Sequence, residues 1–125
     1  TSWISYSSGT TKYLFSIRFV NCNTGWAVGD DGLIMKTTNG GTNWNTQTSG
    51  TTNTLMSIYF VDSNTSWAVG FRGTILKTVN GGTNWNTQTS GTTNTLYSVC
   101  FSNNNTGWAV GKFGTILKTT DGGGN

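Results

Sequence analysis

The sequence contains no proline, no histidine and no glutamate, and only three alanines and six leucines. Because Ala, Leu and Glu are among the strongest helix formers, their scarcity excludes a helical bundle. The chain instead holds 25 Thr, 18 Gly, 15 Asn and 12 Ser, which together exceed half of its 125 residues. Six Trp, six Phe and four Tyr argue against disorder, since aromatic side chains bury large areas when a chain folds. We therefore expect a folded all-β chain with the length of one small domain.

Charged residues are equally scarce: seven Lys and Arg stand against four Asp, a formal net charge of +3. No run of like charge occurs, so the sequence supports neither nucleic-acid binding nor a basic membrane helix. No apolar stretch approaches the ~20 residues that a membrane span requires, and the sequence shows no signal peptide. Cys22 and Cys100 lack the spacing of a metal site, and we expect two buried or incidental thiols.

Self-comparison indicates that the whole chain is built from three copies of one unit. A Trp-Ala-Val-Gly string recurs every 41 residues, beginning at Trp26, Trp67 and Trp108. The units span residues 1–41, 42–82 and 83–123. No linker separates them, so residues 1–125 are interpreted as a single repeat domain.

Each unit is predicted to form four short strands, which in the second unit cover residues 44–48, 55–61, 67–70 and 74–78. The 55–61 segment is almost continuously apolar, as is typical of a strand covered on both faces. The tight turn before the last strand ends in glycine in every copy, at Gly32, Gly73 and Gly114. A hairpin that requires a positive φ at this position explains the glycine. Connections this short make the pairings antiparallel.

The most specific local motif follows the last strand of each unit and reads Thr-Thr-Asn-Gly-Gly-Thr-Asn-Trp at residues 37–44. It recurs at 78–85, and a third copy begins at Thr119. Asn or Asp can accept backbone N–H bonds and cap the turn, the glycines allow unusual dihedral angles, and the Trp ring covers the hairpin. The residues assigned this structural role are Asn39, Gly41, Trp44, Asn80, Gly82, Trp85, Asp121 and Gly123.

This motif resembles the Asp-box, the Ser/Thr-x-Asp-x-Gly-x-x-Trp hairpin of bacterial neuraminidase-type repeats, with Asn replacing Asp in two copies. The longer string over residues 25–41 resembles the blades of photosystem II stability/assembly factor-like β-propellers, and the resemblance covers the whole chain. It implies four-stranded blades whose Leu-x-Ser-Ile-x-Phe strand is innermost and whose strand after the Asp-box is outermost. It also implies an outermost strand at residues 2–6, and it favours an extracellular or periplasmic location.

The predicted fold is therefore all-β, with three four-stranded antiparallel propeller blades of 41 residues. Three blades cannot close a ring, because propellers typically have about four to eight. Open blade faces and unpaired strand edges invite association. We expect either two or three identical chains to close a six- or nine-bladed ring, or the chain to be part of a longer propeller. The alternative fold is a β-trefoil, which also has three four-stranded units.

Asp-box propellers include sialidases and other glycoside hydrolases, so the resemblance raises the question of catalysis. Sialidases use an arginine triad, whereas this chain has two arginines, Arg18 and Arg72, and no glutamate. Other glycosidases need two carboxylates across a cleft, but all four aspartates fall in predicted turns. Without histidine, a Ser/His or Cys/His nucleophile is impossible, and ligands for catalytic zinc are missing. We expect no enzyme, no metal and no cofactor.

The predicted function is a non-catalytic scaffold that binds protein or glycan, as the resemblance implies. The alternatives are a purely structural, self-assembling repeat and, third, a glycoside hydrolase-related propeller. Differences between copies gather on the rim shared by loop 9–13, its copies and the short hairpins. Function often resides on such loops, although neutral drift at turn tips is the alternative explanation. The candidate partner-binding residues are Lys12, Tyr13, Asp30, Asp31, Phe71, Arg72, Lys112 and Phe113.

Two further predictions concern packing. Trp3, Trp44 and Trp85 should lie on outer strands, whereas Trp26, Trp67 and Trp108 should lie between blades. In the innermost strand, a strict period of two would place Ser16 and Arg18 on the same face as Leu14. Arg18 is then a candidate for lining the central channel.

Overall fold

The computed structural model describes residues 2–124, which form eleven strands and three short 3₁₀ turns. Blade 1 contains β1 (Leu14–Phe19), β2 (Gly25–Gly29), η1 (Asp30–Gly32), β3 (Ile34–Thr37) and β4 (Asn45–Gln47). Blade 2 contains β5 (Leu55–Phe60), β6 (Ser66–Gly70), η2 (Phe71–Gly73), β7 (Ile75–Thr78) and β8 (Asn86–Gln88). Blade 3 contains β9 (Leu96–Phe101), β10 (Gly107–Gly111), η3 (Lys112–Gly114) and β11 (Thr115–Thr119). No helix among these residues is long and apolar enough to span a membrane.

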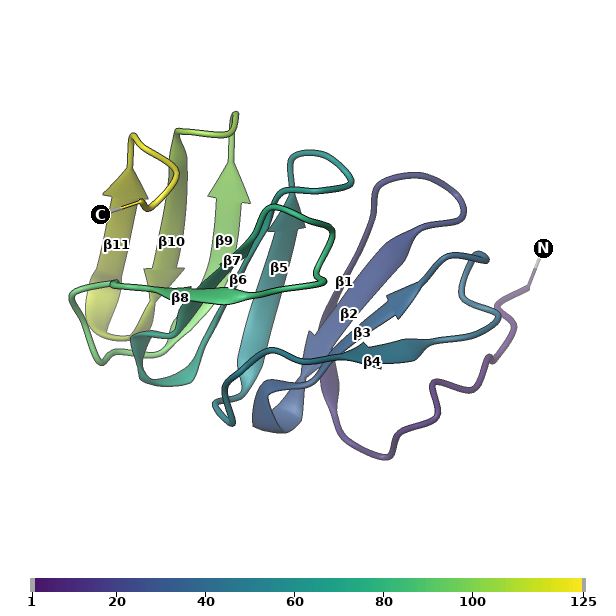
Figure 1. The fold of residues 1–125 in the computed structure, drawn as a ribbon. Helices are drawn as coiled ribbons and strands as arrows, with labels where there is room; N and C mark the ends of the chain where they lie inside the picture. The colour runs from purple at the N-terminus through teal and green to yellow at the C-terminus, as the bar shows by residue number, and fades with distance from the viewer. Residues whose placement is uncertain (1, 125) are drawn as a thin grey trace.

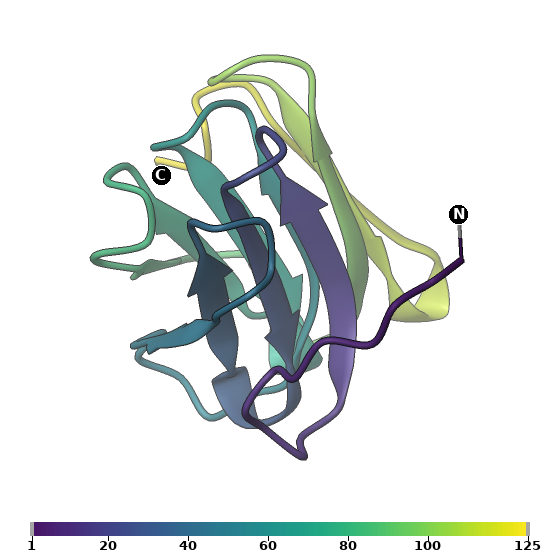
Figure 2. The same cartoon turned by 90° about the vertical axis from the view of Figure 1, so that its right-hand side faces the viewer.

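Each blade is a separate antiparallel sheet whose strands lie in sequence order. The three sheets stand side by side in a row, with residue 2 near one end and residue 124 near the other (Figure 1). The first strands of the blades, β1, β5 and β9, pack against one another, so they are the inner strands. In the turned view the purple β1 and the outer strand β4 lie on opposite sides of the molecule (Figure 2). These sheets are propeller blades, and the trefoil alternative is wrong.

Every inner strand contains a β-bulge near its start. In blade 2, Leu55 pairs with Gly70 and Ser57 pairs with Val69, so Met56 is the extra residue. Gly70 allows this close approach, because a Cβ at that position would lie 2.0 Å from the carbonyl oxygen of Thr54. The bulge reverses the alternation of side chains. Leu55 therefore shares the buried face with Ile58 and Phe60 rather than with Ser57.

The bulge corrects the prediction for Arg18. Blade 1 has the same register shift between Leu14 and Ser16, so Ser16 and Arg18 lie on the opposite face from Leu14. The guanidinium carbon of Arg18 lies 4.1 Å from the ring centroid of Tyr59 on the neighbouring inner strand. Arg18 is exposed, and it contributes a cation–π contact between two blades.

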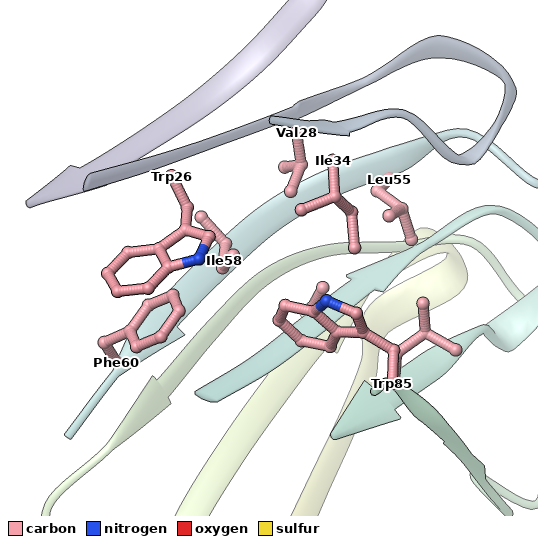
Figure 3. Close-up of a cluster of buried hydrophobic side chains, with 9 residues drawn as sticks. Trp26, Val28, Ile34, Leu55, Ile58, Phe60 and Trp85 are labelled. Atoms are coloured by element: carbon pink, nitrogen blue, oxygen red, sulfur yellow. The ribbon is translucent and has the colours of Figure 1, made fainter. Parts of the chain in front are cut away.

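The core lies between neighbouring blades rather than within one sheet. Trp26, Val28 and Ile34 of blade 1 point toward Ile58, Phe60 and Trp85 of blade 2 (Figure 3). The Trp26 ring stacks on Phe60 with centroids 3.7 Å apart, and Trp67 stacks on Phe101 at 3.5 Å in the next junction. Trp26 and Trp67 thus lie between blades as predicted. Trp85 lies in that same layer, so the predicted separation of outer-strand from inter-blade tryptophans is wrong for Trp85.

The Asp-box hairpins have the predicted geometry. Asn39 Oδ1 accepts a hydrogen bond from the backbone N–H of Asn43 at 2.9 Å, and Thr37 Oγ1 accepts one from Gly41 at 2.9 Å. Trp44 covers the turn, and its indole Nε1 donates to the Gly41 carbonyl at 3.0 Å. Asn80 and Asp121 hold equivalent turns in the other copies. Asn therefore replaces Asp without loss of the capping hydrogen bonds.

Two other expectations are corrected at the ends of the chain and at the thiols. Residues 2–6 form no strand, and Trp3 is 103% exposed rather than packed. The sheet of blade 3 has three strands among the described residues, because none of them pairs with the outer side of β11. Trp108, on the free face of blade 3, is 38% exposed. Cys22 and Cys100 are free thiols that are exposed rather than buried.

Candidate functional site: the turn rim

One end of every blade carries the short turns η1, η2 and η3, together with the loops that lead into the inner strands. We call this end the turn rim; it lies along the lower edge of Figure 1. The opposite end carries the Asp-boxes, which bond to the turns between the first two strands of each blade. Gly40, Gly81 and Gly122 donate to the carbonyls of Asn23, Asn64 and Asn105. The Asp-box rim is therefore committed to structure.

Two backbone hydrogen bonds position the turn of blade 1 against loop 9–13. Asp30 N–H donates to the Tyr13 carbonyl at 3.0 Å, and Tyr13 N–H donates to the Asp30 carboxylate at 3.3 Å. Lys12 Nζ lies 3.5 Å from Asp31 Oδ2, with both side chains largely exposed. An exposed ion pair of this kind contributes between about zero and 1 kcal/mol. Lys12, Tyr13, Asp30 and Asp31 thus form one group on blade 1.

The middle residue of each turn has a left-handed backbone conformation although it is not glycine. The φ angles are 56° at Asp31, 58° at Arg72 and 58° at Phe113, and ψ is 32° or 33° in each case. Such angles are uncommon for residues other than Gly, Asn and Asp. The following glycine also has a positive φ, as the sequence predicted. The scaffold therefore presents three different side chains, an acid, a base and an aromatic ring, from one repeated backbone geometry.

The turns of blades 2 and 3 present the remaining candidate residues to solvent. Phe71 is 42% exposed and Phe113 is 88% exposed. Beside Arg72 lies an open, mostly polar depression of about 720 Å³, bounded by Asn53, Thr74 and loop 89–93. Lys112 N–H donates to the Thr95 carbonyl, as Phe71 N–H does to Thr54, so the backbone of each turn is held in place. Only the side chains of these turns are free to meet a partner.

The structure does not gather the eight predicted residues into one cluster. The four residues of blade 1 form a group, while Phe71 and Arg72 lie on blade 2, and Lys112 and Phe113 on blade 3. Charge also changes along the rim, because both acids of the rim belong to blade 1 and the bases Arg72 and Lys112 belong to the later blades. A surface with separated charges and spaced aromatic rings suits an extended partner better than a compact one.

Sequence reasoning missed the residues that connect the blades along this rim. Thr54 of blade 2 reaches the turn of blade 1, where its Oγ1 accepts from Asp31 N–H at 3.4 Å and lies 3.5 Å from Asp30 Oδ1. Asn53 donates to Thr74 Oγ1 at 2.9 Å, and Asn94 donates to Thr115 in the same way. Their signal in the sequence was the Thr-Asn-Thr string repeated at 52–54 and 93–95, which differs from the first copy.

Each carboxylate of the chain has a structural role. Asp62 Oδ1 accepts from the backbone N–H of Asn64 and Thr65 at 2.8 Å, and Asp121 Oδ1 accepts from Gly123. Asp30 and Asp31 hold the blade 1 turn, at the opposite end of the blades from Asp62 and Asp121. Within residues 2–124, no group of three or more Cys and Asp residues could hold a metal ion. The rim offers recognition by hydrogen bonds, charge and aromatic contact.

Comparisons with known proteins agree with this architecture. The family described as Photosynthesis system II assembly factor YCF48 matches residues 44–125. No curated protein matches the chain. Among solved structures, YCF48 from Cyanidioschyzon merolae superimposes with a TM-score of 0.86 at 25% identity, covering 100% of this chain. A YCF48 bound to D1 peptide gives a TM-score of 0.83 at 25% identity and covers 94%.

The matched proteins are longer than this chain. It spans 39% of the YCF48 that carries the D1 peptide and 42% of the Cyanidioschyzon merolae protein. An ancestral GH74 enzyme also matches, with a TM-score of 0.70 at 23% identity over 88% of this chain and 17% of the enzyme. At that identity the GH74 structure indicates a shared fold.

Proposed function

The chain belongs to the family described as Photosynthesis system II assembly factor YCF48, and from this premise we propose that it is a non-catalytic propeller scaffold whose turn rim binds a partner polypeptide. A YCF48 of similar fold has been solved with a D1 peptide, which supports a polypeptide as the class of partner. The candidate contacts are those of the turn rim: Lys12, Tyr13, Asp30, Asp31, Phe71, Arg72, Lys112 and Phe113.

The observation that carries the proposal is the repeated left-handed turn. Asp31, Arg72 and Phe113 have the same φ and ψ within a few degrees, but each carries a different side chain. A left-handed non-glycine residue costs free energy, on the order of 1 kcal/mol. Glycine would serve the backbone alone, so three non-glycine side chains at this position support a role in recognition. Aromatic and Arg side chains are also enriched at the contacts that dominate protein interfaces.

A non-catalytic function is supported by the uses of the carboxylates. Glycoside hydrolysis needs two carboxyl groups facing one cleft. Here Asp30 and Asp31 fix one turn, and Asp62 and Asp121 belong to hydrogen-bonded turns on the other rim. The third reading, a glycoside hydrolase-related propeller, has no such pair to support it among the described residues.

The proposal includes association with further blades, because the row of three sheets has two open ends. Leu14, Ile17 and Phe19 are exposed on the free face of blade 1, and Trp108, Val110 and Ile116 on the free face of blade 3. Two copies would supply six blades and three copies nine. A purely structural, self-assembling repeat would use these faces alone and leave the turn rim without a partner.

The test compares the parent chain with a variant in which Phe71→Ser, Arg72→Asn, Lys112→Ser and Phe113→Asn are combined. Asn tolerates the left-handed conformation, so the two Asn substitutions keep the turns. Both proteins are applied to an array of overlapping peptides that includes the D1 peptide, and to a glycan array. A control variant, Val79→Thr with Asn104→Ser, changes exposed residues of the Asp-box rim.

We expect the parent and the control to bind peptides and the quadruple variant to bind at least about tenfold more weakly, since losing interface anchors costs more than about 1 kcal/mol. Equal binding by the quadruple variant would contradict the rim as the site. Binding to glycans in place of peptides would change the class of partner. Silence on both arrays would favour the purely structural repeat.

A further inference from the structure

A cavity of about 360 Å³ lies between blades 2 and 3, beside the unpaired edge of β11. Its apolar lining comes from both blades and consists chiefly of Trp67, Val69, Ile75, Val99, Phe101 and Leu117. For comparison, a cavity of about 150 Å³ lined by apolar side chains is large enough to bind benzene. The cavity therefore has room for a bicyclic aromatic ring.

The corresponding space at the junction of blades 1 and 2 is filled by Trp85. Residues 41 positions before the cavity lining (Trp26, Val28, Ile34, Ile58, Phe60 and Leu76) form the cluster in which Trp85 is packed. Trp85 is only 8% exposed there, and Figure 3 shows its indole beside Ile34 and Ile58. No residue of the described part of the chain places an equivalent indole against blade 3. The cavity is thus the seat of an Asp-box tryptophan that residues 2–124 leave empty.

Trp3 has the right position in the repeat to fill this seat. It precedes Trp44 and Trp85 by one and two repeat lengths, and residues 4–6 correspond to the outer strands β4 and β8. Trp3, Ile4 and Tyr6 are 103%, 75% and 61% exposed, and none of them pairs with a strand. Residue 3 and the cavity lie at opposite ends of the row of blades (Figure 1). Trp3 can therefore reach such a seat only on another molecule.

The two end faces of the chain match one another in the same way. Leu14, Ile17 and Phe19 are 41%, 59% and 39% exposed, whereas their copies Leu55, Ile58 and Phe60 are buried against blade 1. On the other end, Trp108, Val110 and Ile116 are 38%, 41% and 71% exposed, whereas Trp26, Val28 and Ile34 are fully buried. Placing blade 1 of one copy against blade 3 of another would repeat an internal junction residue by residue.

We propose that residues 2–6 of a second copy add to β11 as the fourth strand of blade 3 and that its Trp3 fills the cavity. The β3–β4 pairing supplies the register, because Lys36 pairs with Asn45 and Ile34 with Gln47. By the repeat, Lys118 pairs with Ile4 and Ile116 pairs with Tyr6 of the second copy. The added strand leads directly into blade 1 of that copy, which then covers Trp108. The proposal deepens the self-association proposed above and does not depend on the turn rim.

The test measures the association constant of the 125-residue chain by sedimentation velocity over a range of concentrations. The variants are Trp3→Ala and, as a matched control, Phe113→Ser, which removes another exposed aromatic ring from the turn rim. Removing a buried Trp is expected to weaken association by about a hundredfold or more. Because Trp3 is fully exposed in the single chain, Trp3→Ala should keep the circular dichroism spectrum of the parent.

A second measurement isolates the cavity. The chain lacking residues 1–8 is titrated with a synthetic peptide of residues 1–8 and with the same peptide carrying Trp3→Ala. Uptake of the first peptide and not the second supports the proposal. Two results overturn it: equal association of parent and Trp3→Ala, or a monomeric parent together with no uptake of the peptide. A quadruple rim variant that associates normally but binds no partner leaves this proposal standing, so the two proposals can fail separately.

Discussion

Trp67→Ala removes the side chain that joins blades 2 and 3, and it should be among the most destabilising substitutions in the chain. Trp67 is 1% exposed and stacks on Phe101 with centroids 3.5 Å apart and ring planes at 10°. Its indole Nε1 donates to the Gly122 carbonyl at 3.0 Å, and Lys77 Nζ lies 5.2 Å from the ring centroid. Replacing a buried Trp by Ala typically costs about 3–5 kcal/mol.

Trp108→Ala is the matched control, because Trp108 has the same place in the repeat but a different environment. Its ring is 38% exposed, with Lys118 Nζ 5.7 Å from the centroid and no blade beyond it. In a Trp3→Ala background, which removes the proposed strand exchange, Trp108→Ala should cost about 1 kcal/mol or less. The difference between the two sites therefore measures the contribution of the blade junction.

A finer contrast comes from Trp26, which is fully buried but whose Nε1 has no hydrogen-bond partner. Substitution by Phe removes an unsatisfied donor at Trp26 and a satisfied one at Trp67. We expect Trp67→Phe to cost about 1 kcal/mol more than Trp26→Phe, the net value of one hydrogen bond. Unfolding in urea, followed by far-ultraviolet circular dichroism at one protein concentration, gives all four values. Equal costs for Trp67→Ala and Trp108→Ala would refute the placement of the core between blades.

Two more substitutions test local features of the structure. Phe113→Gly should raise the free energy of unfolding by up to about 1 kcal/mol, because glycine adopts φ 58° without strain; a loss of stability in urea would show that the turn is not left-handed. Thr78→Val should cost about 1–3 kcal/mol, because the buried Thr78 Oγ1 accepts from the backbone N–H of Gly82 at 2.9 Å and of Asn80 at 3.3 Å. A neutral effect on the urea midpoint would contradict the assigned Asp-box hydrogen bonds.

The repeat made the blades predictable from the sequence. The period of 41 residues, the apolar 55–61 segment and the glycine-ended turns each correspond to an element of the observed sheets. The Asp-box could be predicted because its chemistry is local: Asn39, the glycines and Trp44 interact within one turn. Local patterns of this kind depend little on the rest of the fold.

Features that depend on close packing between strands could not be predicted in this way. The bulge at Met56 leaves no signal in a period-two pattern, and it placed Arg18 on the wrong face in the sequence analysis. The position of Trp85 in the layer between blades depends on the neighbouring sheet, which no local pattern describes. The rim was found because its side chains vary between copies, yet Thr54, which bridges two blades, was missed because it does not vary between the second and third copies.

The most direct test of the proposed function is a map of where a bound peptide lies. Amide chemical shifts of the isotope-labelled chain, recorded with and without a peptide selected on the array, locate the contact. We predict that the shifts change at residues 9–13, 30–32, 71–73 and 112–114, on the turn rim. Changes confined to the Asp-boxes or to the inner strands would contradict the turn rim as the binding surface.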